Sequence, residues 1–189
     1  MSRMLCLVVL IAAAGFGPPS AAVEGAAFLR DRPLADAVVW LEAPDAPPTT
    51  GHARVVLDQR DMTFIPHVLV VRTGTVVTFP NDDRVFHDVF SDHDGKKFSL
   101  GLYPVGTVRQ VPFDEPGLSR IYCHIHPQMA AYVMVVDSPY FAVSDAQGRF
   151  TLPPAPVGAY RYHAWRPGGA TLEADVSVGA GARLQVRWP

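Results

Sequence analysis

The stretch from Phe64 to Asp92, FIPHVLVVRTGTVVTFPNDDRVFHDVFSD, has the pattern of successive β-strands. The runs HVLVV, TVVTF and VFHDVF are rich in β-branched and aromatic residues, which favour strands. The turn signals RTG and PNDD separate them. Short apolar runs and turns continue on both sides, and no segment keeps a helical period over three turns. The sequence therefore predicts an all-β protein of the sandwich or barrel class.

The composition agrees with many tight turns, since the chain has 18 prolines and 15 glycines. Its 16 basic and 18 acidic residues form no basic stripe or run. Binding to nucleic acid normally requires such a cluster of positive charge. We therefore expect no nucleic-acid partner.

The N-terminal residues 1–22 have the layout of a secretory signal peptide. A single basic residue, Arg3, precedes an apolar run from Met4 to Phe16, and the small residues Ser20, Ala21 and Ala22 follow. This order is typical of a cleaved signal, and the apolar run is short for a membrane span. We predict cleavage after Ala22 and a periplasmic mature protein without a membrane span, with an uncleaved anchor as the alternative.

Cleavage after Ala22 would remove Cys6 and leave Cys123 as the only cysteine of the mature chain. Cysteines of exported proteins are normally paired, because the compartment is oxidising. A single cysteine there is reactive, forms an intermolecular bond or binds a metal. A buried inert thiol is the remaining alternative.

The segment YCHIHPQM, residues 122–129, surrounds this cysteine with metal-binding side chains. Cys123, His126 and Met129 form a C-x2-H-x2-M pattern in one predicted loop. Thiolate and thioether are soft ligands that suit Cu(I), and imidazole serves both oxidation states of copper. A trigonal site with two histidines and one cysteine needs a second histidine from elsewhere, and His87 is the best candidate. Zinc is possible with these ligands, although a thioether is a poor zinc ligand.

The region from about Met62 to Asp137, with the loop YCHIHPQM and the upstream segment GTVVTFPNDDRVFH, resembles the cupredoxins. Within that family, the short gap between the loop histidine and Met129 resembles the amicyanin type. The resemblance implies a Greek-key β-sandwich at 52–137 that holds one type 1 copper ion. His87, Cys123 and His126 would be equatorial ligands, and Met129 would be the weak axial ligand. It also implies that Asn81 ties the two ligand-bearing loops together.

The function implied by the resemblance is the transfer of single electrons between redox partner proteins, such as a cytochrome or a periplasmic dehydrogenase. We found no catalytic constellation and expect no enzymatic activity. A multicopper oxidase would need further histidine pairs and a histidine directly before the cysteine, where this chain has Tyr122. Copper binding or delivery without a dedicated electron-transfer role remains the alternative.

The other candidate side chains have simpler explanations. Met134 lies in an alternating apolar run and is expected in the core. We expect His124 at the surface or next to the ligands, and His67 and His93 at the surface. Of these two, His67 is the candidate for a role near the site. His126 is flanked by three small or apolar residues that we expect to form a flat docking face for redox partners: Pro127, Ala130 and Ala131.

Two further segments lie on either side of the predicted copper domain. VEGAAFLRDRPLADAVVWLEAP and YFAVSDAQGRFTLPPAPVGAYRYHAW resemble the two halves of a carboxypeptidase-regulatory, transthyretin-like β-sandwich. Neither half could bury an apolar face alone, because an isolated hairpin is marginal in water. We therefore predict one discontinuous module from residues 23–48 and 139–189, with docking or support as its role. The alternative is an N-terminal strand pair within the copper domain and a separate C-terminal domain.

Overall fold

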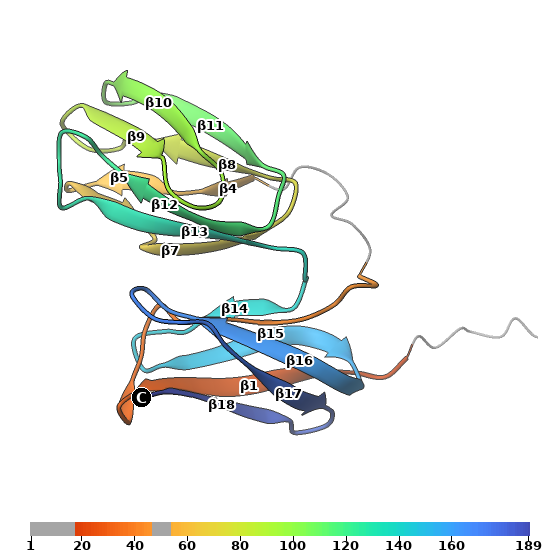
Figure 1. The fold of residues 1–189 in the computed structure, drawn as a ribbon. Helices are drawn as coiled ribbons and strands as arrows, with labels where there is room; N and C mark the ends of the chain where they lie inside the picture. Colours follow the sequence, from red (N-terminus) through yellow and green to blue (C-terminus); the bar gives the residue numbers. More distant parts are fainter. Residues whose placement is uncertain (1–17, 47–53) are drawn as a thin grey trace, which may run out of the picture.

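The computed structural model describes residues 18–46 and 54–189, and all regular secondary structure in these residues is β-strand. The strands form two lobes stacked on one another (Figure 1). The central lobe comprises residues 54–137, and the terminal lobe comprises residues 18–46 and 138–189. In the described ranges we find no helix long and apolar enough to cross a membrane. The predicted all-β class is confirmed.

The central lobe contains one five-stranded sheet, one three-stranded sheet and a short hairpin. The strand orders are β10-β9-β12-β13-β7 and β11-β8-β4, and β5 pairs with β6 in the hairpin. The strands are β4 (Arg54–Val56), β5 (Asp58–Arg60), β6 (Thr63–Ile65), β7 (Val68–Arg72), β8 (Thr75–Pro80), β9 (His87–Ser91), β10 (Phe98–Tyr103), β11 (Val108–Phe113), β12 (Gly117–Tyr122) and β13 (Ala130–Val136).

The core of the central lobe follows from the alternation of side chains along its strands. In β8, Val77 and Phe79 are fully buried, while the alternate residues Val76 and Thr78 are partly exposed. Successive side chains of a strand point to opposite faces, so one face of β8 supplies the core. Large side chains from several strands complete the same apolar cluster: Phe64, Phe79, Tyr103, Phe113 and Ile121.

The terminal lobe contains two four-stranded sheets that enclose a second apolar core. In one sheet the order is β15-β1-β18, with β2 attached to β1, and in the other it is β14-β3-β16-β17. The strands are β1 (Ser20–Leu29), β2 (Arg32–Pro33), β3 (Val38–Leu41), β14 (Phe141–Val143), β15 (Arg149–Pro156), β16 (Gly158–Trp165), β17 (Leu172–Val178) and β18 (Arg183–Trp188).

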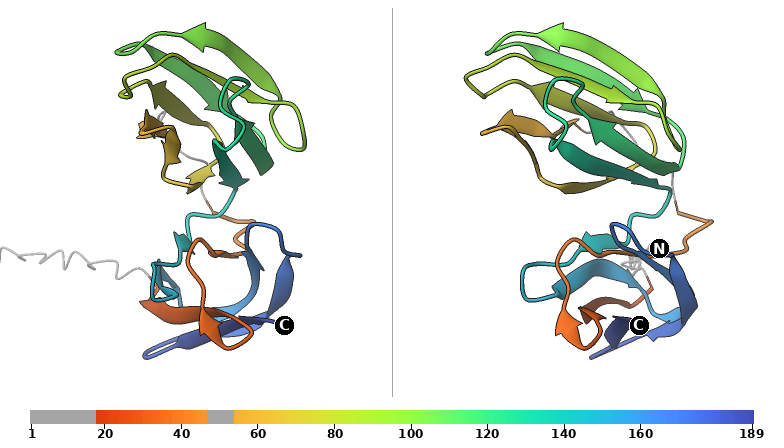
Figure 2. Two further views of the ribbon diagram at one scale, coloured as in Figure 1. Left: turned by 90° about the vertical axis from the view of Figure 1, so that its left-hand side faces the viewer. Right: turned by 60° about the vertical axis from the view of Figure 1, so that its left-hand side comes forward.

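Strands from before and after the central lobe pair directly in both of these sheets (Figure 2). β1 lies antiparallel to β15 and parallel to β18. β3 lies between β14 and β16, where Trp40 is opposite Phe141 and His163. Ser144 adds a side-chain link, since its hydroxyl accepts the N–H of Ala37 at 2.9 Å and donates to the carbonyl of Leu34 at 2.6 Å. The chain therefore leaves this lobe after β3 and returns to it before β14.

The two lobes meet through a third apolar cluster. Its members come from strands of both lobes: Val38, Val68, Val70, Met134, Val136 and Trp165. The rings of Tyr132 and Trp165 make an edge contact with centroids 5.2 Å apart. Asp36 and the Nδ1 atom of His67 are 2.7 Å apart across the same boundary. Met134 is buried as expected, although it packs between the lobes.

Several predicted features fall on residues outside the described ranges. The predicted signal peptide is described only from residue 18 onward, and residues 47–53, where the predicted module and copper domain adjoin, are not described. Ser20 and Ala21, just before the predicted cleavage position, belong to β1 and pair with Pro156 and Ala155. Val23 is the first fully buried side chain of β1, so the strand beyond Ala22 keeps its core contacts.

Candidate metal centre

The candidate ligands lie where two neighbouring strands of the five-stranded sheet meet. His87 is the first residue of β9, and Cys123 directly follows the last residue of β12. β9 and β12 are antiparallel, with Tyr122 opposite Phe90. An antiparallel pair places the start of one strand beside the end of the other. Sheet pairing thus brings together two side chains that are 36 positions apart in the sequence.

The loop between β12 and β13 adds the second histidine. Cys123 Sγ lies 3.6 Å from His126 Nδ1 and 3.9 Å from His87 Nδ1. The two Nδ1 atoms are 3.0 Å apart. Of the described residues, these three form the one group of His, Cys, Asp or Glu whose ligand atoms converge, all within 4.8 Å of one another.

These separations fit a bound metal ion. Metal–nitrogen distances of about 2.0 Å and metal–sulfur distances of about 2.3 Å imply donor separations of about 3.3–3.7 Å in a trigonal or tetrahedral site. Of the observed separations, 3.6 Å lies within that range, 3.0 Å lies just below it and 3.9 Å lies just above it. Two imidazoles and one thiolate form the trigonal donor set that copper uses in electron-transfer proteins.

Met129 ends the loop at the start of β13. Its N–H donates to the carbonyl of His126 at 2.8 Å, which closes a tight turn. Its side chain is 1% exposed and belongs to the same apolar cluster as Cys123. The thioether is therefore buried in the core cluster that also contains Cys123.

The exposure of the three converging residues differs. His87 is fully buried and Cys123 is 4% exposed, whereas His126 is partly exposed. Cys123 forms no disulfide. The cluster is thus enclosed by protein on most sides, and the His126 imidazole is the member that reaches the surface.

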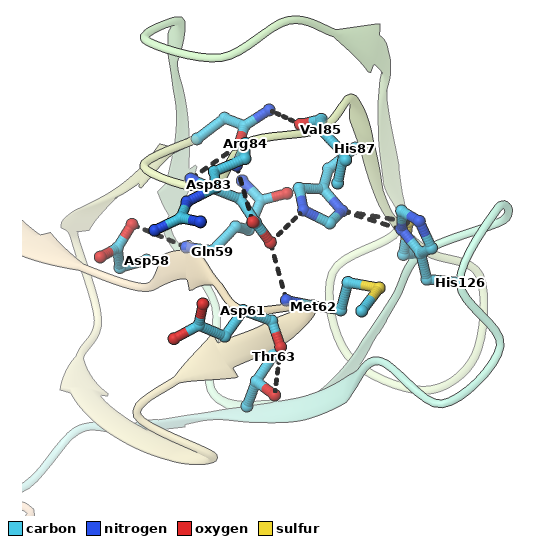
Figure 3. Close-up of polar contacts among 12 residues, drawn as sticks. Asp58, Gln59, Asp61, Met62, Thr63, Asp83, Arg84, Val85, His87 and His126 are labelled. Carbon is cyan, nitrogen blue, oxygen red and sulfur yellow. Dashed lines mark hydrogen bonds and ion pairs between the residues drawn. The ribbon is translucent and has the colours of Figure 1, made fainter.

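Asp83 contacts the outer nitrogen of His87, an interaction that the sequence analysis missed. Its Oδ2 lies 2.9 Å from His87 Nε2, and the His87 ring lies between Asp83 and His126 (Figure 3). Burial alone would raise the pKa of Asp83, but the backbone N–H groups of Met62 and Arg84, together with His87, lower it to about 2. The available signal in the sequence is the spacing of four residues between Asp83 and His87, within a segment, PNDD, that by itself indicates only a turn.

Asn81 is fully buried next to this region. Its amide nitrogen donates to the carbonyls of Val85 at 2.9 Å and Tyr103 at 3.2 Å. Its side-chain oxygen accepts the N–H of Asp83 at 3.2 Å. Within the described residues, its side-chain bonds therefore organise the turn before His87 and tie it to the end of β10. They do not reach the Cys123 loop, contrary to the expected link between the two loops.

The remaining described histidines lie outside the cluster. The side chain of His124 is 60% exposed, pairs with Asp88 at 2.8 Å and stacks on Phe90. His67 contacts Asp36 between the lobes and not the ligand group. His93 is exposed, as expected. His163 stacks on Trp40 in the terminal lobe.

The expected docking face is only partly at the surface. Pro127 is exposed and Ala130 is partly exposed, but Ala131 is 1% exposed and packs in the core. The prediction for Ala131 is wrong because β13 begins at Ala130, and alternation along the strand turns the next side chain inward.

Comparison with known proteins finds partial similarity to solved structures. No protein-family profile and no curated protein sequence matches the chain. The chain is similar to a purple cupredoxin from Nitrosopumilus maritimus, with 28% identity, a TM-score of 0.39 and coverage of 44% of this chain and 99% of that chain. For an amicyanin variant in its reduced state, the identity is 22%, the TM-score 0.40 and the coverage 51% and 99%.

A copper-containing nitrite reductase from Thermus scotoductus is similar over 58% of this chain, with 23% identity and a TM-score of 0.42. The match spans 28% of the length of that reductase.

Proposed function

We propose that this protein is a blue-copper protein that carries single electrons between redox partners. Its ligands would be His87, Cys123, His126 and Met129. The observation that carries the proposal is the convergence of one thiol and two imidazoles within 4.8 Å at one end of a β-sheet. Copper bound there would supply a one-electron couple between Cu(I) and Cu(II).

The protein's contribution is a donor set that needs little rearrangement. His87 begins β9, Cys123 directly follows the paired strand β12, and the turn closed by Met129 holds His126 beside them. Their neighbours are close-packed core side chains, which resist displacement. Similar ligand positions in both oxidation states keep the reorganisation that accompanies electron transfer small.

We propose that electrons enter and leave through His126. Its imidazole is partly exposed, whereas His87 and Cys123 are buried. Exposed apolar side chains adjoin the two histidines in the chain, with Phe86 51% exposed and Ile125 49% exposed. Small apolar surfaces of this kind suit the brief encounters of redox partners. A cytochrome or a periplasmic dehydrogenase is the class of partner that we propose.

The remaining parts of the proposal concern location and the terminal lobe. We propose export to the periplasm after cleavage at Ala22. We also propose that residues 23–48 and 139–189 form a transthyretin-like module around a cupredoxin domain at 52–137, with a supporting or docking role. The shared sheets of β1, β3 and the C-terminal strands support this division.

The visible absorption spectrum of the mature protein loaded with Cu(II) tests the function. We expect an intense blue colour from thiolate-to-copper charge transfer. Cys123→Ser should abolish the colour because it removes the sulfur donor. Met129→Gln should retain one copper ion and shift the band. His93→Ala, which changes an exposed histidine outside the cluster, should leave the spectrum unchanged. A colourless copper-loaded wild type would exclude the blue-copper proposal and favour copper storage or delivery.

A further inference from the structure

Asp83 is a buried carboxylate in the turn that precedes His87. It is 8% exposed, and its Oδ2 lies 2.9 Å from His87 Nε2. The guanidinium of the nearby Arg60 pairs instead with Asp58 and Asp82, at 3.1 and 3.6 Å. The charge of Asp83 is therefore directed at the imidazole of a candidate ligand.

Backbone donors hold the Asp83 carboxylate in position. Oδ2 accepts the N–H of Met62 at 2.7 Å, and Oδ1 accepts the N–H of Arg84 at 2.7 Å. These hydrogen bonds favour the ionised carboxylate and offset the cost of its burial. The hydrogen bond from Met62 also connects the β5–β6 turn to the turn before β9, and the contact with His87 Nε2 connects both turns to the imidazole.

An ionised carboxylate can only accept hydrogen bonds. The Nε2 atom of His87 must then be the donor to Asp83, and in the neutral ring Nδ1 carries the lone pair. Nδ1 is the atom that lies 3.0 Å from His126 Nδ1 and 3.9 Å from Cys123 Sγ. Asp83 thereby selects the tautomer whose free nitrogen faces the ligand group.

We propose that Asp83 is a positioning residue for the metal, which fixes the tautomer and ring orientation of His87 and stabilises the oxidised ion through its negative charge. This inference rests on the proposed function. A carboxylate behind a ligating histidine makes the imidazole more basic. The more highly charged Cu(II) gains more from this than Cu(I), so Asp83 lowers the reduction potential of the site.

Two variants separate this role from a general effect of charge. Asp83→Asn removes the negative charge and leaves one of the two side-chain oxygens as an acceptor. Asp82→Asn is the matched control, because Asp82 is adjacent in sequence, its side chain is 52% exposed and it pairs with Arg60. Loss of such an outer partner typically weakens metal binding by about 10- to 100-fold. For Asp83→Asn we expect a loss of this size for Cu(II) and a smaller loss for Cu(I).

The measurement is the reduction potential of the copper-loaded variants, with Cu(II) and Cu(I) affinities as the second readout. Each tenfold loss confined to Cu(II) raises a one-electron potential by about 59 mV. We expect a rise of this order for Asp83→Asn and little change for Asp82→Asn. Equal potentials for wild type and Asp83→Asn, or equal shifts for both variants, would overturn the inference.

A measurement on the metal-free wild type needs neither copper nor a folded variant. Nitrogen NMR of isotope-labelled histidine at mildly alkaline pH should show His87 protonated at Nε2. His124 provides an internal reference with the opposite tautomer, because its Nδ1 atom faces Asp88 at 2.8 Å. A proton on Nδ1 of His87 would overturn the inference. A wild type without a blue band but with His87 protonated at Nε2 would refute the proposed function and leave this orienting role of Asp83 supported.

Discussion

At the scale of single residues, Tyr103 shows how burial controls an ionisable group beside the candidate site. It is fully buried and lies opposite His87 in the pairing of β10 with β9. Its hydroxyl accepts from Gln59 Nε2 at 2.5 Å and lies 3.4 Å from the Phe79 carbonyl. Burial, which disfavours the phenolate, is the main cause that raises the pKa of Tyr103 to about 12.

We predict that this phenol makes stability depend on alkaline pH. The pKa of Tyr103 in the folded protein lies above its ordinary value of 10.0, so the contribution to stability is complete below pH 10 and is lost as pH rises toward 12. A rise of the pKa from 10.0 to about 12 implies that the free energy of unfolding falls by about 1.4 kcal/mol by pH 11. Urea unfolding of the metal-free protein between about pH 8 and pH 11 measures this loss.

The control for that measurement is Tyr103→Phe, which removes the titrating hydroxyl and keeps the ring in the core. Its free energy of unfolding should decline less over the same pH interval. Identical pH profiles for the two proteins would show that Tyr103 does not cause the alkaline loss.

At the scale of elements, the turn between β14 and β15 depends on Gly148. This residue has φ = 74°, in the left-handed region, and its N–H donates to the Asp145 carbonyl at 2.8 Å. An added Cβ would lie 2.5 Å from the carbonyl oxygen of Ala27 in β1. The turn and the strand approach closely enough for the carbonyl oxygen of Gly148 to accept the N–H of Ala27 at 2.8 Å. Glycine at position 148 therefore permits a backbone hydrogen bond between this turn and β1.

We predict that Gly148→Ala destabilises the protein more than Gly168→Ala. Both glycines have positive φ values, 74° and 66°, so alanine at either position incurs left-handed strain of about 1–2 kcal/mol. A Cβ at Gly168 meets no atom within 4 Å, whereas one at Gly148 collides with the β1 backbone. Urea denaturation of both variants measures the difference, and equal losses would show that the turn moves away from β1 without cost.

At the scale of the whole molecule, the apolar cluster between the lobes determines whether they unfold together. Met134 is 6% exposed and packs in this cluster with Val38 and Trp165 of the terminal lobe. All three tryptophans lie in the terminal lobe, at positions 40, 165 and 188. The candidate copper ligands all lie in the central lobe, so each lobe has its own spectroscopic probe.

We predict that tryptophan fluorescence and copper colour report one shared unfolding transition in the wild type. Met134→Ala should lower the free energy of unfolding by about 2–5 kcal/mol and separate the two transitions, because it weakens the packing between the lobes. Leu102→Ala is the control, since Leu102 is 57% exposed and surface changes usually cost less than about 0.5 kcal/mol. Separate transitions already in the wild type would mean that the interface does not couple the lobes.

The sequence by itself determined the strand class and the contents of the ligand loop. Alternating β-branched residues and turn signals act over a few positions, so the all-β class could be predicted without tertiary contacts. The spacing of Cys123, His126 and Met129 is equally local, because one short loop presents all three. The structure brings the first two of these together with the predicted His87, and it buries Met129 in the core cluster that contains Cys123.

Only the tertiary structure decided which distant groups meet. The pairing of β9 with β12 places His87 at the loop, and the bonds from Met62 and Arg84 turn Asp83 toward His87. The inward direction of Ala131 depends on the residue at which β13 begins. Strand registers and strand partners are set by contacts between segments far apart in the chain. They therefore cannot be predicted from the residues of one short segment.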